Sequence, residues 1–458
     1  MMMQDALPGI KRYLAPAKLG LVPAGFLIRL MTGFICHLGR MSASQAAEAV
    51  RSDSRHRAAI VRFLAKCGWS GDWCVLAQLA EVVLQAESSK KGTWLFLIDS
   101  TLMSHQGKKM DNTYSCGNRK RRPRQGRRYN KNKHTRKSCH AFVMGLLITP
   151  SGIRIPSCRC YFTKEYCKRK NRPQRTQTEL AAELITALVV PAKVELVVLG
   201  DTSFDAKCIR DACAARGFDW IVPVNPERVL AGPKKQRPKV TSLVQEMSAD
   251  HFAPLRLTPD QGAFVAQRRM ARCRRGSKTK SRTWYVHEER RAVHSVGEVQ
   301  LVFSMKEPPK TGTKVSVDKI LMTNSRRSAA EVVELYLLRW QIELFFKELK
   351  STLGIDEYRF LSFDKVEAWV AACLLTFLYL EWHRTKMLQD PHLSAKDKEW
   401  WRSQRTHGLC VAIRQQAEEA ELKRLGDYTH TRTGMKKLKR LLRQARPLEY
   451  RRPTRKAS

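Results

Sequence analysis

The sequence predicts an α/β fold that is interrupted by a β-rich segment and flanked by helical regions at both ends. A continuous apolar run, 94–98, and a mainly apolar segment, 194–200, have the composition of buried strands, and an aspartate follows each of them, Asp99 and Asp201. Residues 336–350 lack Gly and Pro and consist mainly of good helix formers. This combination of acid-tipped strands and a long helix predicts a sheet with an acidic site at one edge.

The chain is long enough for two or three domains and is strongly basic. Of its 458 residues 43% are hydrophobic, so a large core can form. Lysine and arginine number 84 against 42 acidic residues, which gives a net charge of +42. A folded chain with this charge is expected to bind a polyanion, with nucleic acid as the first candidate and an anionic membrane surface as the second.

Membrane integration and structural zinc are not expected. The most apolar N-terminal run, 24–38, is too short to span a membrane and is interrupted by Arg29. The 13 cysteines are scattered, which indicates reduced thiols and a cytoplasmic location. Cys158 and Cys160 lack the partners of a zinc site, so core packing is the better interpretation.

Residues 1–88 are predicted to form a helical domain. Ser42 and Gln45 have the spacing of a capping box, and residues 56–66 and 73–85 have the apolar spacing of two further helices. Two helices joined by a tight turn are the core of many modules that read DNA. An ordinary helical bundle explains the same pattern equally well.

Residues 89–224 have the element order of an RNase H-like domain. Strands are expected at 94–98, 141–148 and 154–162, followed by alternating helices and strands up to residue 224. A basic segment from 108 to 137 joins the first two strands and should lie beside the acids, although such a run is usually a solvated loop. Its arginines could clamp a phosphate backbone without reading sequence, and the candidates are Arg119, Arg121 and Arg122.

The remaining chain divides into three predicted parts. Residues 225–320 form a β-rich insertion, 321–385 complete the catalytic domain, and 386–458 form a helical basic C-terminal region. Within the insertion, Trp284 and Tyr285 are candidates for stacking on a nucleobase. Packing in the core of the insertion is the plainer interpretation of both residues.

The helix at 336–350 carries a group of polar residues on one side. At 3.6 residues per turn, Tyr336, Arg339, Glu343 and Lys350 fall within an arc of roughly 60°. Apolar residues such as Ile342 occupy the opposite side. Ion pairs on a solvated face would account for most such patterns, but here the basic groups surround one acid and an aromatic hydroxyl joins them.

Three carboxylates placed in this way suit hard divalent cations, which prefer oxygen ligands. Two such ions activate an attacking oxygen and stabilise a leaving oxygen in phosphodiester chemistry. Other acids fit less well: Glu334 and Glu348 lie more than about 100° around the helix, and Asp205 lies beyond the strand end. The residues alone therefore indicate metal-dependent chemistry on DNA or RNA.

The spacing of Tyr336, Arg339, Glu343 and Lys350 matches the motif Y-x2-R-x3-E-x6-K at every position. With the two aspartates, the chain resembles the DDE transposases of bacterial insertion sequences that carry this motif, over roughly residues 94–361. The resemblance implies two Mg²⁺ ions, replaceable by Mn²⁺, held by the triad Asp99, Asp201 and Glu343. It also implies that the tyrosine, arginine and lysine of the motif contact the transposon-end strand.

The resemblance further implies a DNA transposase that works by cut and paste. Such an enzyme binds the terminal inverted repeats of its element through an N-terminal domain, cleaves the ends and transfers the 3′ ends into target DNA. In this group the ends pass through hairpins, and an aromatic residue, here Trp284 or Tyr285, stacks on a flipped base. Double-stranded DNA, a homodimer in a synaptic complex and a bacterial, nucleoid-associated location follow from the same resemblance, with no membrane.

Two other functions remain open from the sequence. An RNase H-like nuclease would share the three acids but would not join strands. A non-catalytic DNA-binding protein derived from a transposase would retain the basic charge, although the intact triad argues against it. A basic ribosomal or chromatin-like protein would leave the acid-tipped strands unexplained.

Overall fold

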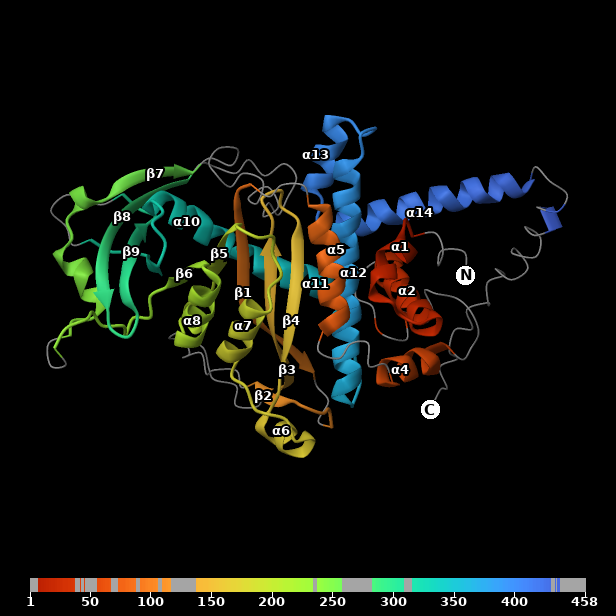
Figure 1. The fold of residues 1–458 in the computed structure, drawn as a ribbon, viewed down its shortest axis with the longest axis horizontal. Coiled ribbons are helices and arrows are strands. Elements are labelled where there is room, and N and C mark those ends of the chain that lie inside the picture. Colours follow the sequence, from red (N-terminus) through yellow and green to blue (C-terminus); the bar gives the residue numbers. More distant parts are fainter. Residues whose placement is uncertain are drawn as a thin grey trace, which may run out of the picture.

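The computed structural model describes residues 7–37, 42, 45, 56–66, 73–87, 91–105, 109–116, 137–233, 237–257, 282–308, 315–429, 433 and 435–436. One mixed sheet runs through it in the order β2-β3-β1-β5-β6-β10-β9-β8-β7, with β4 also pairing with β3 (Figure 1). Its strands are β1 (Thr93–His105), β2 (Tyr114–Cys116), β3 (Lys137–Ile148), β4 (Arg154–Tyr161), β5 (Glu195–Leu199), β6 (Asp219–Pro223), β7 (Ala253–Leu257), β8 (Arg282–Val293), β9 (Gly297–Met305) and β10 (Lys319–Thr323).

Strand β1 lies in the middle of the sheet and extends further than predicted. It pairs in parallel with β5 and antiparallel with β3. The first six residues are all buried, as expected for a strand covered on both faces, but burial then alternates as far as His105. Asp99 therefore lies within the strand, and the prediction that it ends the strand is wrong. The amphipathic second half continues the ladder with β3.

The segment predicted as a β-rich insertion is rich in strands, but these strands belong to the main sheet. β10 pairs with β6, β9 with β10, β8 with β9, and β7 with β8, all antiparallel. The sheet therefore continues without interruption from β1 to β7, at the left of Figure 1.

Helix α12 (Phe363–Gln389) organises the helical part of the molecule. It is buried along most of its length and contacts β4. Helices from both ends of the chain pack against it, at the right of Figure 1. They are α1 (Ile10–Leu14), α2 (Leu21–Cys36), α4 (His56–Lys66), α5 (Cys74–Ala86), α13 (Ala395–Ser403) and α14 (Thr406–Thr429). The two flanking helical regions thus share one core.

The N-terminal capping box predicted at Ser42 and Gln45 is present. The backbone N–H of Ser42 donates to Gln45 Oε1 at 2.8 Å, and the backbone N–H of Gln45 donates to Ser42 Oγ at 3.3 Å. Most of the helix that it was expected to open lies outside the described residues.

Residues 336–350 do not form one helix, which corrects the prediction. Helix α10 (Ala329–Leu338) ends and α11 (Trp340–Ser351) begins at Arg339. The backbone N–H of Arg339 donates to the carbonyl of Tyr336 at 3.0 Å, and that of Ile342 donates to the carbonyl of Arg339 at 3.1 Å. These bonds span three residues and tighten the turn, a local distortion that side-chain periodicity does not reveal.

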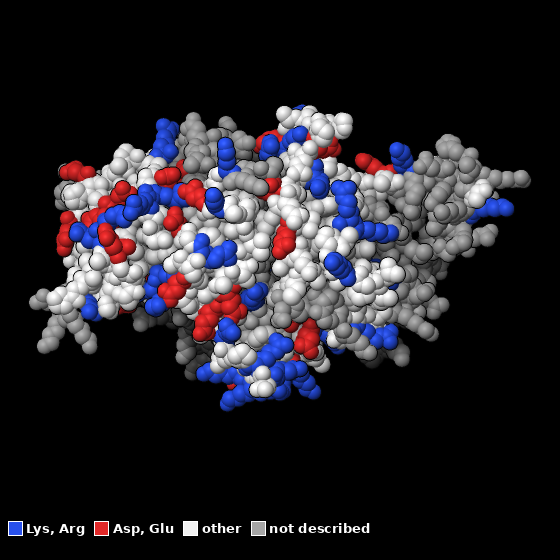
Figure 2. Space-filling view, in the orientation of Figure 1, with Lys and Arg blue, Asp and Glu red and all other residues white. Residues whose placement is uncertain are grey.

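Helix α7 (Gln177–Thr186) packs on β3 and β4 and on α8 (Lys207–Arg216), and α11 contacts β1. A short helix, α6 (Lys164–Lys170), follows β4 and projects from the lower side in Figure 1. Figure 2 shows basic side chains gathered there.

The expectation, drawn from the scattered cysteines, that all thiols are reduced is wrong. Nine described cysteines are free thiols, but Cys139 is disulfide-bonded, so the thiols are not uniformly reduced.

In the described part of the chain, no helix is both long and apolar enough to cross a membrane.

Candidate active site

The two aspartates lie at the same level of neighbouring parallel strands. Leu97 of β1 is paired with Leu199, the last residue of β5. Asp99 lies two residues further along β1, and Asp201 lies two residues beyond the end of β5. Adjacent strands are separated by about 4.8 Å, so the register places the two carboxylates side by side. Asp201 also caps a short 3-10 helix, since its Oδ1 accepts from the backbone N–H of Ser203 at 2.8 Å.

Glu343, in the first turn of α11, is connected to Asp99 through Arg339. One terminal nitrogen of the Arg339 guanidinium lies 2.7 Å from Glu343 Oε1, and the other lies 3.5 Å from Asp99 Oδ2. The side chains of Arg339, Asp99 and Glu343 are 15%, 18% and 33% exposed. The guanidinium therefore bridges a strand acid and the helix acid in a half-buried site.

The electrostatics of Asp99 agree with three acids that lie close together. The pKa of Asp99 is raised from 3.8 to about 6: burial is the largest cause, the charges of Asp201 and Glu343 also raise it, and the backbone N–H of Ser100 and the charge of Arg339 lower it. A half-buried carboxyl with a raised pKa and specific charged neighbours is a candidate functional group.

The donor set fits a hard divalent cation. Asp99, Asp201 and Glu343 offer only carboxylate oxygens, the ligands that Mg²⁺ prefers, and their mutual repulsion is relieved by added positive charge. As the side chains lie, no three His, Cys, Asp or Glu of the described residues are arranged to hold a metal ion. The Arg339 guanidinium already bridges two of these carboxylates.

Tyr336 also lies at the site, beside a lysine that the sequence analysis did not identify, Lys319. Burial raises the pKa of Tyr336, and the charges of Asp201 and Glu343 contribute to the rise. The ammonium of Lys319, on β10, lies 4.8 Å from the centre of the Tyr336 ring. Burial lowers the pKa of Lys319, and Arg339 lowers it further. Lys319 lies in a segment predicted as a strand, and no local pattern marks it.

A pocket of about 220 Å³ adjoins these residues. Trp284 lies on its wall and is 8% exposed, with the Lys306 ammonium 5.7 Å from its ring. Trp340, by contrast, is 54% exposed and was not predicted to take part. Both predicted aromatic residues also take part in core packing: Trp284 belongs to the hydrophobic core, and Tyr285 is partly buried against it. The aromatic and basic residues lining the pocket are Trp284, Lys306, Lys319, Tyr336, Arg339 and Trp340.

Lys350 lies apart from the acids. Its ammonium donates to the backbone carbonyl of Leu102 at 3.0 Å, three residues beyond Asp99 on β1. Burial lowers its pKa, and Asp356 is the carboxylate that opposes this shift. The structure therefore brings Tyr336 and Arg339 of the motif to the acids and places the lysine farther along the strand. The predicted loop residues Arg119, Arg121 and Arg122 lie outside the described residues.

Two of the acids set aside in the sequence analysis, Asp205 and Glu348, are paired elsewhere. Asp205 is 2% exposed and pairs with Arg210 at 2.5 Å and Arg228 at 2.8 Å. Glu348 is buried, and its two oxygens accept from Arg154, Arg405 and Thr406.

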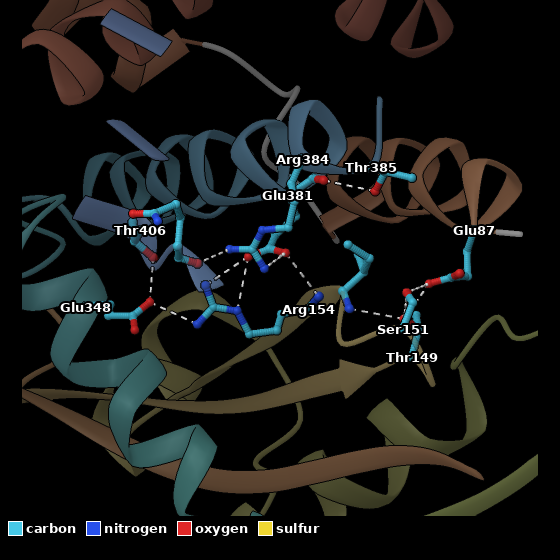
Figure 3. A network of polar contacts seen from close by, with 11 residues as sticks. Glu87, Thr149, Ser151, Arg154, Glu348, Glu381, Arg384, Thr385 and Thr406 are labelled. Atoms are coloured by element: carbon cyan, nitrogen blue, oxygen red, sulfur yellow. Dashed lines mark hydrogen bonds and ion pairs between the residues drawn. The ribbon is translucent and has the colours of Figure 1, made fainter. Parts of the chain in front are cut away.

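Glu348 belongs to a buried ionic network that fixes the helix carrying Glu343 (Figure 3). Arg154, at the start of β4, contacts Glu348 of α11 at 2.9 Å and Glu381 of α12 at 2.9 Å. Arg384 contacts the other oxygen of Glu381 at 3.0 Å. Buried charges require partners, so this network specifies how α11 lies against β4 and α12.

Comparison with known proteins agrees with this geometry. The model of a family described as "Transposase DDE domain" matches residues 90–379. Over 54 residues the chain is 44% identical to the transposase for insertion sequence element IS421 of Escherichia coli. The identity is the same over 54 residues of "Putative transposase InsL for insertion sequence element IS186A" of Escherichia coli strain K12. Each alignment covers 12% of this chain and 15% of the relative.

The matched family region contains all three acids, Arg339, Lys350 and the pocket. It spans well over half of the chain, and the resemblance stated from the motif is confirmed. The chain belongs to the family of proteins with a transposase DDE domain.

Proposed function

We propose that this protein is a DNA transposase that binds the terminal inverted repeats of its element, cleaves the ends by metal-dependent hydrolysis and transfers the 3′ ends into target DNA. The observation that carries the proposal is the convergence of Asp99, Asp201 and Glu343, from two strands and a helix, inside the matched family region. Carboxylates crowded together in this way form an environment that suits divalent cations.

The three acids would hold two Mg²⁺ ions, or Mn²⁺ in their place. When bound, the ions activate the attacking water or 3′-hydroxyl and stabilise the leaving oxygen. The protein's own residues position the DNA. A phosphate at the site competes with Asp99 and Glu343 for Arg339, whose planar guanidinium can hold two phosphate oxygens at once.

The pocket beside Tyr336 supports a route through hairpin ends. A hairpin at a duplex end displaces a base, and a displaced base is stabilised by stacking on an aromatic ring. Trp284 and Trp340 supply rings, and Lys306 and Lys319 supply charge for the adjoining phosphates. We propose that the pocket of about 220 Å³ receives such a base.

The same proposal gives each remaining segment of the chain a role in transposition. Residues 1–88 bind the ends, 89–224 and 321–385 form the RNase H-like catalytic domain, 225–320 are its β-rich insertion, and 386–458 are a basic helical region. Two ends must be held together for cut-and-paste chemistry, so a homodimer on DNA is proposed. The location is the bacterial cytoplasm, in association with the nucleoid.

The test uses a DNA fragment that spans the gene and its flanks, incubated with the purified protein and Mg²⁺. Glu343→Gln is compared with wild type, and Glu298→Gln, at an exposed acid on β9, serves as the matched control. We expect double-strand breaks outside the gene and joined products with wild type and control. Glu343→Gln should bind the DNA but leave it uncut. Cuts without joining would favour the nuclease, and binding without cuts would favour a non-catalytic binder.

A further inference from the structure

A second basic surface lies outside the site described above. Lys164, Lys168 and Lys170 on α6 are exposed, as is Arg172, two residues beyond its end. These four residues form the α6 patch. Their neighbour Arg169 pairs with Asp111. None of the four patch residues forms an ion pair with an acidic side chain in the described part of the chain. The patch therefore presents four basic side chains without an ion-pair partner, on a helix that carries one acid, Glu165. Figure 2 shows basic side chains gathered at the lower edge of the molecule.

Helix α6, which carries the patch, is held in place by an N-terminal cap and by aromatic packing. The side chain of Thr163 caps α6 by accepting from the backbone N–H of Tyr166. The Tyr166 ring is buried and stacks on Phe162 with ring centres 5.3 Å apart, and both rings pack on Phe363 of α12.

Two of the charged groups rest on these rings. The Arg172 guanidinium lies 5.2 Å from the Phe162 ring, and the Lys170 ammonium lies 6.0 Å from the Tyr166 ring. Side chains held in this way lose less conformational entropy when they bind a ligand.

Helix α6 follows β4, whose end lies at the same edge of the sheet as the end of β1, the strand that carries Asp99. Strands β1 and β4 are both antiparallel to β3, so they run in the same direction and their carboxyl ends lie at the same edge of the sheet. Leu102 and Tyr161 both pair with Ala141, so the end of β4 is level with the carbonyl that holds Lys350. Two strand spacings, about 10 Å, separate these points.

We propose that the α6 patch binds the phosphate backbone of the target-DNA duplex during strand transfer, an inference that rests on the transposase function proposed above. A duplex at the acids reaches this edge of the sheet within a few base pairs. Lysine holds phosphate as a point charge and reads no base, which suits DNA without a fixed sequence. In Figure 1, α6 lies away from α1, α2 and α4, which belong to the region proposed to bind the element's ends.

The first measurement is the salt dependence of binding to a duplex of random sequence. A variant with the four patch residues changed to glutamine is compared with wild type. Since each phosphate contact contributes about 0.9 to the slope of log K against log salt, the loss of four contacts should flatten the slope by about 3.6. A control variant loses the same charge at exposed lysines elsewhere and should keep the wild-type slope. Its changes are Lys193→Gln, Lys207→Gln, Lys239→Gln and Lys396→Gln.

The second measurement separates target DNA from the element's ends. The patch variant should cleave the fragment that carries the element within about twofold of wild type, but join it to a plasmid about tenfold less at moderate salt. An unchanged salt slope would overturn the proposal. A loss of cleavage as large as the loss of joining would also overturn it, because the patch would then contact the ends.

Failure of the proposed function gives a different result. In that case wild type neither cuts nor joins DNA, and the proposed binding of target DNA by the patch is refuted together with the transposase function. An unchanged salt slope in a protein that cuts and joins DNA refutes only the proposal for the patch. An unfolding midpoint equal to that of wild type is required of both variants. All four patch side chains are exposed, and Lys170 and Arg172 lose only their contacts with the Tyr166 and Phe162 rings, so their replacement should meet this requirement.

Discussion

Replacement of Asp99 by asparagine is expected to stabilise the metal-free protein at alkaline pH. Burial, together with Asp201 and Glu343, raises the pKa of Asp99 from 3.8 to about 6. A carboxyl with a raised pKa binds its proton more tightly in the folded state than in the unfolded state. Ionisation of Asp99 therefore costs stability in the folded protein.

The size of this cost follows from the pKa. A shift of about two units corresponds to about 3 kcal/mol at 1.36 kcal/mol per unit. The Asp99 side chain is only 18% exposed, so solvent screens little of it. The cost is absent below pH 3.8, grows as the pH rises and is complete above about pH 6. Asp99→Asn should therefore raise the unfolding free energy by up to about 3 kcal/mol at pH 8 and by little at pH 4.

Urea unfolding with a chelator, at both pH values, measures this difference. Asp250→Asn, at an exposed acid, is the matched control and should change the unfolding free energy by less than about 0.5 kcal/mol. Saturating Mg²⁺ should stabilise wild type more than Asp99→Asn, because a ligand that binds only the folded state adds its binding free energy. If Asp99→Asn is no more stable than wild type at pH 8, burial and the neighbouring acids do not raise the pKa of Asp99 in the folded protein.

Three further predictions concern other parts of the site. Glu348→Gln leaves Arg154 without one of its buried partners and should lower the unfolding free energy by about 3 to 5 kcal/mol in urea titrations; an unchanged midpoint would show that the network is dispensable. Arg339→Ala should reduce the yield of the DNA-bound, uncleaved complex in gel-shift assays made with Ca²⁺, and an equal yield would argue against a phosphate contact. Changing Arg119, Arg121 and Arg122 to glutamine should flatten the salt slope of DNA binding by about 3; an identical slope would mean that the loop is solvated and makes no contact.

Much of the fold could be predicted because its signals are local. The buried run before Asp99, the apolar strand before Asp201 and the helical spacing around α12 each depend on side chains close together in sequence. Burial on both faces of a strand demands a continuous apolar run, and burial of one helix face demands a 3.6-residue period. The motif that carries Glu343 and Arg339 is equally local.

The tight turn at Arg339 could not be predicted, because the pattern of side chains does not record it. A change from four-residue to three-residue hydrogen bonds leaves the order of polar and apolar side chains almost unaltered. The extension of β1 beyond Asp99 was missed because its second half alternates between buried and exposed side chains, a weaker signal over so few residues.

By itself, the sequence predicted that Asp99, Asp201, Glu343, Tyr336 and Arg339 belong to one site, and it indicated which segments form the central strands. Only the tertiary structure decided that Arg339 bridges Asp99 and Glu343, that Lys350 binds the carbonyl of Leu102 instead, and that Lys319 comes to lie beside Tyr336. It also placed α6 at the same edge of the sheet as the acids. The physical reason is that periodicity encodes burial within one element, whereas distances between elements depend on strand order and register, which arise from the packing of the whole core.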